Sequence, residues 1–304
     1  MSKNESLRHV KVPLTARLLR FGFQFGGAVF PTFFGKLAYR YFSHPRKRAK
    51  HKYNDDVLDS AQVADFQFNT LNIKYYRWGN PDHPLIVLIH GWESRGTALR
   101  GFVKPFLEQG YQVATFDAPA HGDSEGEAVN MPIYANCIGA FFQKVGVPHG
   151  IIAHSFGGNS TMYYLSRISP ETTLNRIVLV AAPSNIYKVL DDVAVLMHLA
   201  EAAKNKFFAK IETLINMPLK DCQVDKLSKQ AKIGRLMLVH DDADKIVPFA
   251  DSLAYHAAHS TSVLLNAKDM GHFNLMKKQE IKSEIVNFIT SGYSPEHRSD
   301  LSDL

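Results

Sequence analysis

Residues 150–158 constrain the fold of this chain more than any other part of the sequence. They read Gly-Ile-Ile-Ala-His-Ser-Phe-Gly-Gly, so an apolar run ends at a serine that glycines follow. The pattern is typical of a buried strand, a sharp turn at Ser155 and a helix, the Gly-x-Ser-x-Gly arrangement that lifts a serine hydroxyl clear of the backbone. The positions two before and two after the serine must be small. Here they are Ala153 and Gly157, a mild departure from the strict pattern.

The bulk composition fits one large α/β domain with some additions. The chain has 304 residues, of which 45% are apolar and 21% charged, and this is enough for a substantial core. Its two cysteines, Cys137 and Cys222, are too few for a disulfide framework or a cysteine-based metal site, and they indicate reduced, buried thiols. We therefore expect a cytoplasmic protein, with membrane association through the N-terminal arm as an open alternative, and we expect neither a metal nor a cofactor.

The formal net charge of +6 is unevenly distributed along the chain. Residues 1–52 contain 12 Lys/Arg and one acid, Glu5, whereas residues 53–304 contain 23 Lys/Arg and 28 Asp/Glu. The basic character therefore belongs to an N-terminal arm, and the rest of the chain is mildly acidic. This distribution argues against a nucleic-acid-binding groove on the main body.

The N-terminal arm carries an aromatic segment, residues 21–34, between basic flanks. The apolar stretch is about 14 residues long, and roughly 20 are needed to span a bilayer. No small-x-small cleavage site follows it, which argues against a secretory signal. We predict a helical arm that packs its aromatic side chains on the body. The alternative is peripheral membrane contact through residues 10–52, with phenylalanines in the bilayer and Lys/Arg at the headgroups.

Predicted strands and helices alternate along most of the chain. Two antiparallel strands are expected at 64–69 and 71–78, followed by buried strands at 84–89, 111–116, 151–153, 177–182, 235–239 and 262–265. Helical spacing occurs between them, for example over 97–109, 131–145 and 275–291. This alternation predicts an α/β fold with a mostly parallel sheet, helices on both faces, and ligands at the carboxyl ends of the strands.

A serine nucleophile needs a base within hydrogen-bond reach and an acid that orients the base. The turn motif orders these groups along the chain as serine, acid and histidine. His272 is the candidate base because it follows the last strand, directly after Gly271. Three aspartates after the preceding strand compete as the acid: Asp241, Asp242 and Asp244. We choose Asp244, because the loop before it supplies the reach from the strand end to the imidazole.

Backbone N–H groups near the serine are the candidates for binding an oxyanion. Phe156 directly follows the serine and supplies one of them. The second is expected from the loop His90-Gly91-Trp92, and we choose Trp92. Four other histidines are expected to be structural rather than catalytic: His90, His121, His154 and His240.

With these motifs the chain resembles the α/β-hydrolase superfamily, specifically bacterial serine hydrolases of esterase or lipase type. The resemblance lies in five segments: His90-Gly91-Trp92, Phe116 to Ser124, Ala153 to Gly157, His240 to Pro248, and Gly271-His272. It implies a central sheet of eight strands and hydrolysis through an acyl-enzyme. It also implies a helical cap between the sixth and seventh strands.

The predicted organisation follows from these assignments. Residues 1–60 form the basic, aromatic arm, and 61–184 with 233–291 form the hydrolase core. Residues 185–232 form the helical cap insertion, and 292–304 form a polar tail.

We expect cofactor-free cleavage of a small-molecule carboxylic ester with an apolar acyl or alcohol group. Ser155 would attack, His272 would move the proton, Asp244 would orient His272, and the Trp92 and Phe156 amides would hold the oxyanion. Two alternatives stay open: cleavage of a thioester or carbon–carbon bond by the same triad, and a non-catalytic binding module. The acyl length and the oligomeric state are also open.

Overall fold

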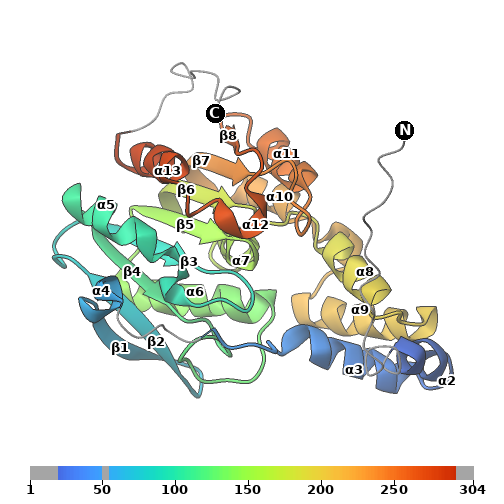
Figure 1. Cartoon of the computed structure of the whole chain (residues 1–304). Coiled ribbons are helices and arrows are strands. Elements are labelled where there is room, and N and C mark those ends of the chain that lie inside the picture. The colour runs from blue at the N-terminus through green and yellow to red at the C-terminus, as the bar shows by residue number, and fades with distance from the viewer. Residues whose placement is uncertain (1–19, 50–54, 292–304) are drawn as a thin grey trace, which may run out of the picture. The chain divides into compact units, whose positions relative to one another are not determined.

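The computed structural model describes residues 20–49 and 55–291 of the chain. They belong to two compact units (Figure 1). Unit 1 comprises the chain up to Phe42 together with Lys188–Leu219, and unit 2 comprises Ser43–Tyr187 together with the chain from Lys220 onward. Part of the predicted arm, residues 1–19, and the predicted tail, residues 292–304, lie outside the described residues.

Unit 2 is built on one eight-stranded sheet in the order β1-β2-β4-β3-β5-β6-β7-β8. The strands are β1 (Gln62–Phe68), β2 (Leu71–Trp78), β3 (Leu85–Ile89), β4 (Gln112–Phe116), β5 (Gly150–His154), β6 (Thr173–Val180), β7 (Lys232–His240) and β8 (Val263–Asn266). Strand β2 pairs antiparallel with β1 and with β4, and all other neighbours are parallel. The predicted mostly parallel sheet of eight strands is therefore confirmed.

Helices cover both faces of this sheet (Figure 1). In unit 2 they are α4 (Asp56–Asp59), α5 (Val103–Glu108), α6 (Met131–Val145), α7 (Phe156–Tyr163), α10 (Val224–Leu227), α11 (Phe249–Ala258), α12 (Gly271–Asn274) and α13 (Gln279–Ser291). Helix α6 occupies the span predicted for it. Asn130 accepts a hydrogen bond from the Ile133 N–H at its start, and Gly146, with φ of 96°, ends it.

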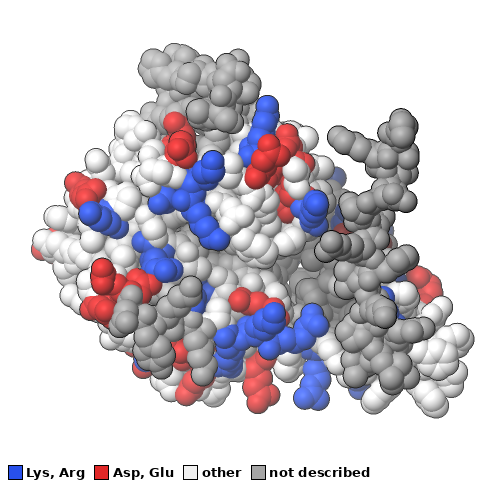
Figure 2. All heavy atoms as spheres, in the orientation of Figure 1, with Lys and Arg blue, Asp and Glu red and all other residues white. Residues whose placement is uncertain are grey.

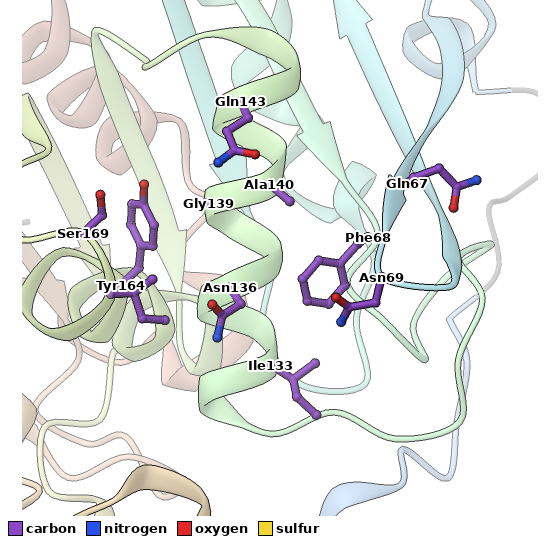
Figure 3. Close-up of a pocket in the computed structure, with 11 residues that line it drawn as sticks. Gln67, Phe68, Asn69, Ile133, Asn136, Gly139, Ala140, Gln143, Tyr164 and Ser169 are labelled. Carbon is purple, nitrogen blue, oxygen red and sulfur yellow. The ribbon is translucent and has the colours of Figure 1, made fainter.

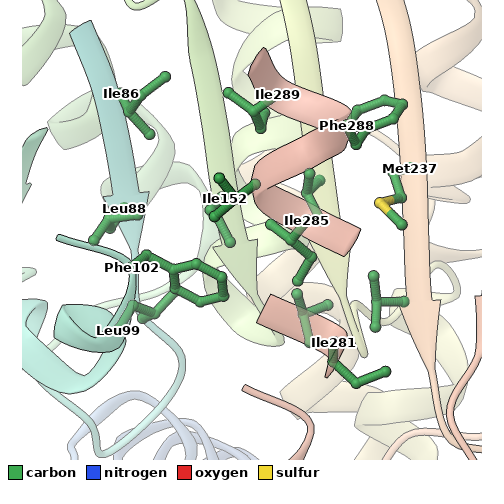
Figure 4. Packing of buried hydrophobic residues seen from close by; sticks show 14 of the residues in the cluster. Ile86, Leu88, Leu99, Phe102, Ile152, Met237, Ile281, Ile285, Phe288 and Ile289 are labelled. Atoms are coloured by element: carbon green, nitrogen blue, oxygen red, sulfur yellow. The ribbon is translucent and has the colours of Figure 1, made fainter. Parts of the chain in front are cut away.

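The central strands are buried on both faces because their sequences are continuous apolar runs. Every residue of β3, β4 and β5 is buried. On one face the core includes Phe102 before α5, and Ile285 and Phe288 on α13, packed over strand residues such as Ile152 (Figure 4). On the other face, the rings of Phe116 in β4 and Phe141 in α6 lie 4.7 Å apart. This double-sided core fixes the strand ends from which the polar loops emerge.

The predicted helix over 97–109 is only half α-helical. A 3₁₀ segment, η2 (Gly96–Phe102), precedes α5, which begins at Val103. Pro105 explains the boundary, because proline fits the first turn of an α-helix but would break a longer one. The last predicted helix, over 275–291, begins later than expected, at Gln279 of α13.

Unit 1 contains the described part of the arm and most of the insertion. Its arm elements are η1 (Gly22–Gly26), α2 (Gly27–Val29) and α3 (Pro31–Ser43), and its insertion elements are α9 (Glu201–Ile215) and most of α8 (Ile186–Leu196). The arm is helical, as predicted, and it packs on α9. A hydrogen bond of 3.2 Å from the Ala200 N–H to the Phe23 carbonyl joins the two segments, and the rings of Phe42 and Phe207 lie 5.9 Å apart.

Candidate active site

Ser155 stands at a strained turn between β5 and α7. Its φ of 52° and ψ of −122° are rare for a residue with a side chain, and they hold the hydroxyl at the carboxyl edge of the sheet. Its own N–H donates to the Val180 carbonyl of the neighbouring strand at 2.9 Å. The neighbouring backbone explains why small residues are needed here. A Cβ added at Gly157 would lie 2.3 Å from the His90 carbonyl oxygen.

The structure brings the predicted serine, histidine and acid together. His272 Nε2 lies 3.0 Å from Ser155 Oγ, and His272 Nδ1 lies 2.8 Å from Asp244 Oδ2. The side chains of His272 and Asp244 are 4% and 0% exposed, so solvent hardly competes for these contacts. An ionised carboxylate can only accept, so Nδ1 carries the proton and Nε2 is left to accept from the serine hydroxyl. The arrangement can thus transfer a proton from Ser155 to His272.

Asp244 is held ionised by its neighbours. Burial alone would raise the pKa of this carboxyl, but hydrogen bonds from His240, His272 and the Ile246 N–H outweigh it and hold the pKa far below its usual range. The Ile246 N–H donates to Asp244 Oδ1 at 2.7 Å, and the Val247 N–H donates to the same oxygen at 3.1 Å. The second oxygen therefore stays available to His272.

The two competing aspartates lie elsewhere in the same loop. Asp242 is exposed, and its carboxylate accepts from the Asn266 amide at 3.0 Å. Asp241 is buried and accepts from the Met270 N–H at 2.6 Å and from the Gly271 N–H. Asp241 therefore fastens the turn that carries His272, a positioning role that the sequence analysis did not foresee.

The histidines expected to be structural are all hydrogen-bonded near the site. His240 Nδ1 lies 2.7 Å from Ser252 Oγ, and its Nε2 lies 3.4 Å from Asp244 Oδ2. His154 Nε2 donates to the His272 carbonyl at 3.1 Å. Burial and the adjacent His272 lower the pKa of His154 to about 4, so it stays neutral beside the site at neutral pH.

The loop after β3 lies against the serine turn. A Cβ added at Gly91 would be 3.2 Å from Ser155 Cβ, and the rings of Trp92 and Phe156 lie 5.5 Å apart. Phe156 is the first residue of α7, and the first N–H groups of a helix have no partner within that helix. The segment from Gly91 to Trp92 and the start of α7 are thus side by side at the hydroxyl.

Two buried histidines fix the shape of that loop. His90 Nε2 accepts from the Ala118 N–H at 2.9 Å, and His121 Nε2 accepts from the Glu93 N–H at 3.0 Å. Burial lowers the pKa of His90 to about 3 and lowers that of His121, which keeps both rings neutral and able to accept. His90 follows β3 and His121 follows β4, and these two strands are neighbours in the sheet. This placement is the sequence signal that could have indicated that each histidine bonds to the loop of the other strand.

A groove of about 510 Å³ lies on another part of unit 2 and includes none of these residues. It runs between the β1–β2 turn, α6 and the segment after α7 (Figure 3). Two of its amide side chains bond within the fold, since Gln67 donates to Asn72 and Asn136 donates to the Pro132 carbonyl. On the face that Figure 2 displays, Lys/Arg and Asp/Glu side chains of unit 2 lie interspersed rather than in one basic patch.

The sequence and the structure both match known proteins. A family model described as alpha/beta hydrolase fold matches residues 84–216. The chain therefore has the α/β-hydrolase fold. The match covers the loop after β3, the serine turn, and the insertion helices α8 and α9.

The curated relatives of this α/β-hydrolase-fold chain are distant. It is 28% identical over 121 residues to a bifunctional esterase/perhydrolase of Acinetobacter calcoaceticus, which is 39% of this chain and 44% of that protein. It is also 28% identical over 120 residues to a non-heme chloroperoxidase of Streptomyces lividans, which is 38% of this chain and 44% of that protein. The matches thus span less than half of either relative.

Solved structures share the fold over more of the chain. A membrane phospholipase A, described as a bacterial virulence factor, superposes with a TM-score of 0.59 at 16% identity, covering 92% of this chain and 96% of that one. An esterase of Pyrococcus furiosus gives a TM-score of 0.59 at 18% identity, covering 80% and 98%. At these identities the likeness establishes the fold alone, and the chemistry must be argued from the site.

Proposed function

We propose that the chain is a serine hydrolase that cleaves carboxylic esters through an acyl-enzyme. The observation that carries the proposal is the continuous hydrogen-bonded line from Asp244 through His272 to Ser155 at the carboxyl edge of the sheet. The similarity to an esterase/perhydrolase supports the same reaction class.

The first half-reaction forms the acyl-enzyme. Ser155 Oγ attacks the ester carbonyl while His272 Nε2 takes the hydroxyl proton, and the ionised Asp244 stabilises the resulting imidazolium. The tetrahedral oxyanion is held by the N–H groups of Trp92 and Phe156, each worth about 10²–10³ in rate. His272 then gives its proton to the departing alcohol, and the acyl group stays on Ser155.

The second half-reaction repeats the sequence with water in place of Ser155. His272 takes a proton from water, the hydroxide attacks the acyl carbon, and the Ser155 oxygen leaves with the proton of His272. The products are a carboxylic acid, an alcohol and the starting enzyme. No step calls on a cofactor or a metal.

Labelling and turnover test the proposal together. A fluorophosphonate probe should label the wild-type chain at Ser155, and p-nitrophenyl esters of graded acyl length should be hydrolysed. Ser155→Ala should abolish both, whereas Ser169→Ala, which removes a partly exposed hydroxyl outside the site, should preserve both.

Hydrolysis of acyl-CoA with no hydrolysis of any ester would replace the proposal with a thioesterase that uses the same triad. A wild-type chain that the probe does not label would favour a non-catalytic binding module.

A further inference from the structure

The described arm helices of unit 1 expose large apolar side chains. Five of them are more than half exposed, and we call them the aromatic face: Phe21 at 61%, Phe25 at 55%, Val29 at 69%, Phe30 at 64% and Phe33 at 63%. Phe21, Phe25 and Val29 follow one another at intervals of four residues up to the end of α2, and Phe33 follows at the same interval after the break at Phe30. The rings of Phe21 and Phe25 lie 4.3 Å apart. The exposed residues thus cluster within residues 21–33 of the chain, and two of their rings are in contact.

The buried side of the arm combines Phe23, which is 4% exposed, with glycines that pack closely on α9. A Cβ added at Gly27 would lie 3.2 Å from the Cβ atoms of Ala200 and Ala203 at the start of α9. A Cβ added at Gly35 would lie 2.7 Å from Lys206 Cβ and 2.9 Å from the Ala203 carbonyl oxygen. The arm therefore uses its glycines for close packing on α9 and directs most of its phenylalanines away from it.

This arrangement is the reverse of that expected for a helix on a water-soluble body. An amphipathic helix normally turns its apolar stripe toward the core, because burying a phenylalanine stabilises the fold. Contiguous exposed apolar patches on proteins mark sites where a partner or a membrane binds. The aromatic face has the exposure and composition of such a site.

The charge around the aromatic face favours an anionic partner. From residue 6 to residue 54 the chain contains no Asp or Glu, and Arg20 and Lys36 lie beside the aromatic face in sequence. Phenylalanines with flanking cations are typical of segments that lie in the interface of an anionic bilayer. A second copy of the chain would present the same cationic flank, so a symmetric dimer through this face would bring like charges together.

We propose that the aromatic face of unit 1 docks on an anionic lipid bilayer, with the phenylalanines in the interface and the flanking cations at the headgroups. Among residues 20–49 and 55–291, no helix is long and apolar enough to cross a membrane. The small-residue side of the arm stays on α9, so the arm contacts lipid with one side only. The proposal is independent of the proposed ester hydrolysis.

Vesicle sedimentation tests the docking without using turnover. The full-length chain carrying Ser155→Ala should sediment with vesicles of phosphatidylcholine and phosphatidylglycerol, and more weakly with phosphatidylcholine alone. Phe25→Ser with Phe33→Ser should weaken binding to both by at least about tenfold per phenylalanine, from the transfer free energy of the ring. Arg20→Gln with Lys36→Gln should weaken only the binding to anionic vesicles, by about fivefold per charge.

The matched control replaces equally exposed apolar residues of unit 2. Val147→Ser with Leu253→Ser, at 60% and 48% exposure in the wild type, should leave the binding unchanged. Equal loss in this control, or wild-type binding by the phenylalanine variant, would overturn the proposal. So would a full-length chain that stays in solution with both kinds of vesicle.

The conservative variant Phe30→Trp gives a second readout, which does not require the fold to accept serine in place of phenylalanine. Phe30→Trp should show a blue-shifted emission on adding anionic vesicles, relative to the wild type, and quenching by brominated acyl chains. Unchanged Phe30→Trp emission would refute insertion at this face. Concentration-dependent dimerisation that the phenylalanine variant abolishes, together with no vesicle binding, would instead assign the aromatic face to a second copy.

Discussion

Replacement of Asp244 by asparagine tests most directly how the site works. In the wild type, Asp244 Oδ1 accepts from two backbone N–H groups and Oδ2 accepts from His272 Nδ1 at 2.8 Å. Asparagine has only one oxygen. If that oxygen stays with the backbone, the amide donates toward His272 Nδ1 and forces the proton onto Nε2. Nε2 then cannot accept the proton of Ser155.

The expected loss follows from this change of tautomer. A wrong tautomer in a serine–histidine–aspartate triad lowers kcat by about 10⁴, which corresponds to about 5.4 kcal/mol at 1.36 kcal/mol per factor of ten. If the amide instead turns its oxygen toward His272, the two backbone N–H groups lose their acceptor. That orientation would cost about 1–3 kcal/mol of stability for each unsatisfied group. We expect the first orientation and therefore a folded, nearly inactive protein.

The neighbouring aspartates supply matched controls for the same chemical change. Asp242→Asn alters an exposed side chain that bonds only Asn266 among the contacts described, so kcat should stay within about twofold. Asp241→Asn leaves a single oxygen for the Ala243, Met270 and Gly271 N–H groups, which donate to two carboxylate oxygens in the wild type. It should lower the melting temperature, and by loosening the turn that carries His272 it should lower kcat by about 10².

The assay is kcat on a p-nitrophenyl ester for all three variants, with the melting temperature measured alongside. The reasoning predicts that activity falls most in Asp244→Asn, while stability falls most in Asp241→Asn. If Asp244→Asn keeps activity within tenfold of the wild type and Asp241→Asn abolishes it, then Asp241 orients the histidine and our assignment is wrong.

Three further outcomes are expected. Gly157→Ala should lower kcat by about 10²–10³, because its Cβ would meet the His90 carbonyl 2.3 Å away and displace the loop after β3, which we propose binds the oxyanion. Ala153→Gly, which restores the strict motif, should lower the free energy of unfolding by less than about 1 kcal/mol. Similar activity in the two variants would contradict the steric argument. Stability should fall as the pH drops from about 6.5 to 5, because burial lowers the pKa values of His90 and His154 in the folded state to about 3 and 4, whereas both side chains take up protons in the unfolded state. Each histidine should contribute up to about 2 kcal/mol of this loss. Thermal unfolding across this pH range measures the loss, which should be smaller in His154→Gln. Phe288→Ala should lower the free energy of unfolding in urea by about 3–5 kcal/mol, since this ring is fully buried between α13 and the sheet. The control is Phe273→Ala, which removes a side chain that is 61% exposed and should change the free energy of unfolding by less than about 0.5 kcal/mol.

Much of unit 2 was predictable because its signals are local. Continuous apolar runs predicted buried strands such as β3, and Ser155 between small residues predicted the turn at the end of β5. The alternation of strands and helices then predicted a mostly parallel sheet with helices on both faces. The boundary before α5 was missed because the pattern of apolar residues continues through Gly96–Phe102, whereas the backbone there is a 3₁₀ helix.

The site was predictable only in part, since its members are far apart in sequence. The order of serine, acid and histidine came from the motif, but the separation of Asp241, Asp242 and Asp244 into three roles depends on where β7 and β8 end. Adjacent aspartates have nearly the same sequence context. Their contacts differ because each points toward a different part of the turn that carries His272.

The arm shows the same division between sequence and structure. The sequence by itself determined that residues 21–34 are rich in aromatic residues and flanked by cations, that the strands are buried, and that Ser155 sits at a strand-to-helix turn. Each of these features depends on residues that are neighbours in sequence. Only the tertiary structure decided that Gly27 and Gly35 face α9 while the phenylalanines of the aromatic face are exposed, and that Asp244 reaches His272. The physical reason is that exposure and hydrogen-bond geometry depend on which distant segment packs against a residue, and a linear pattern carries that information only indirectly.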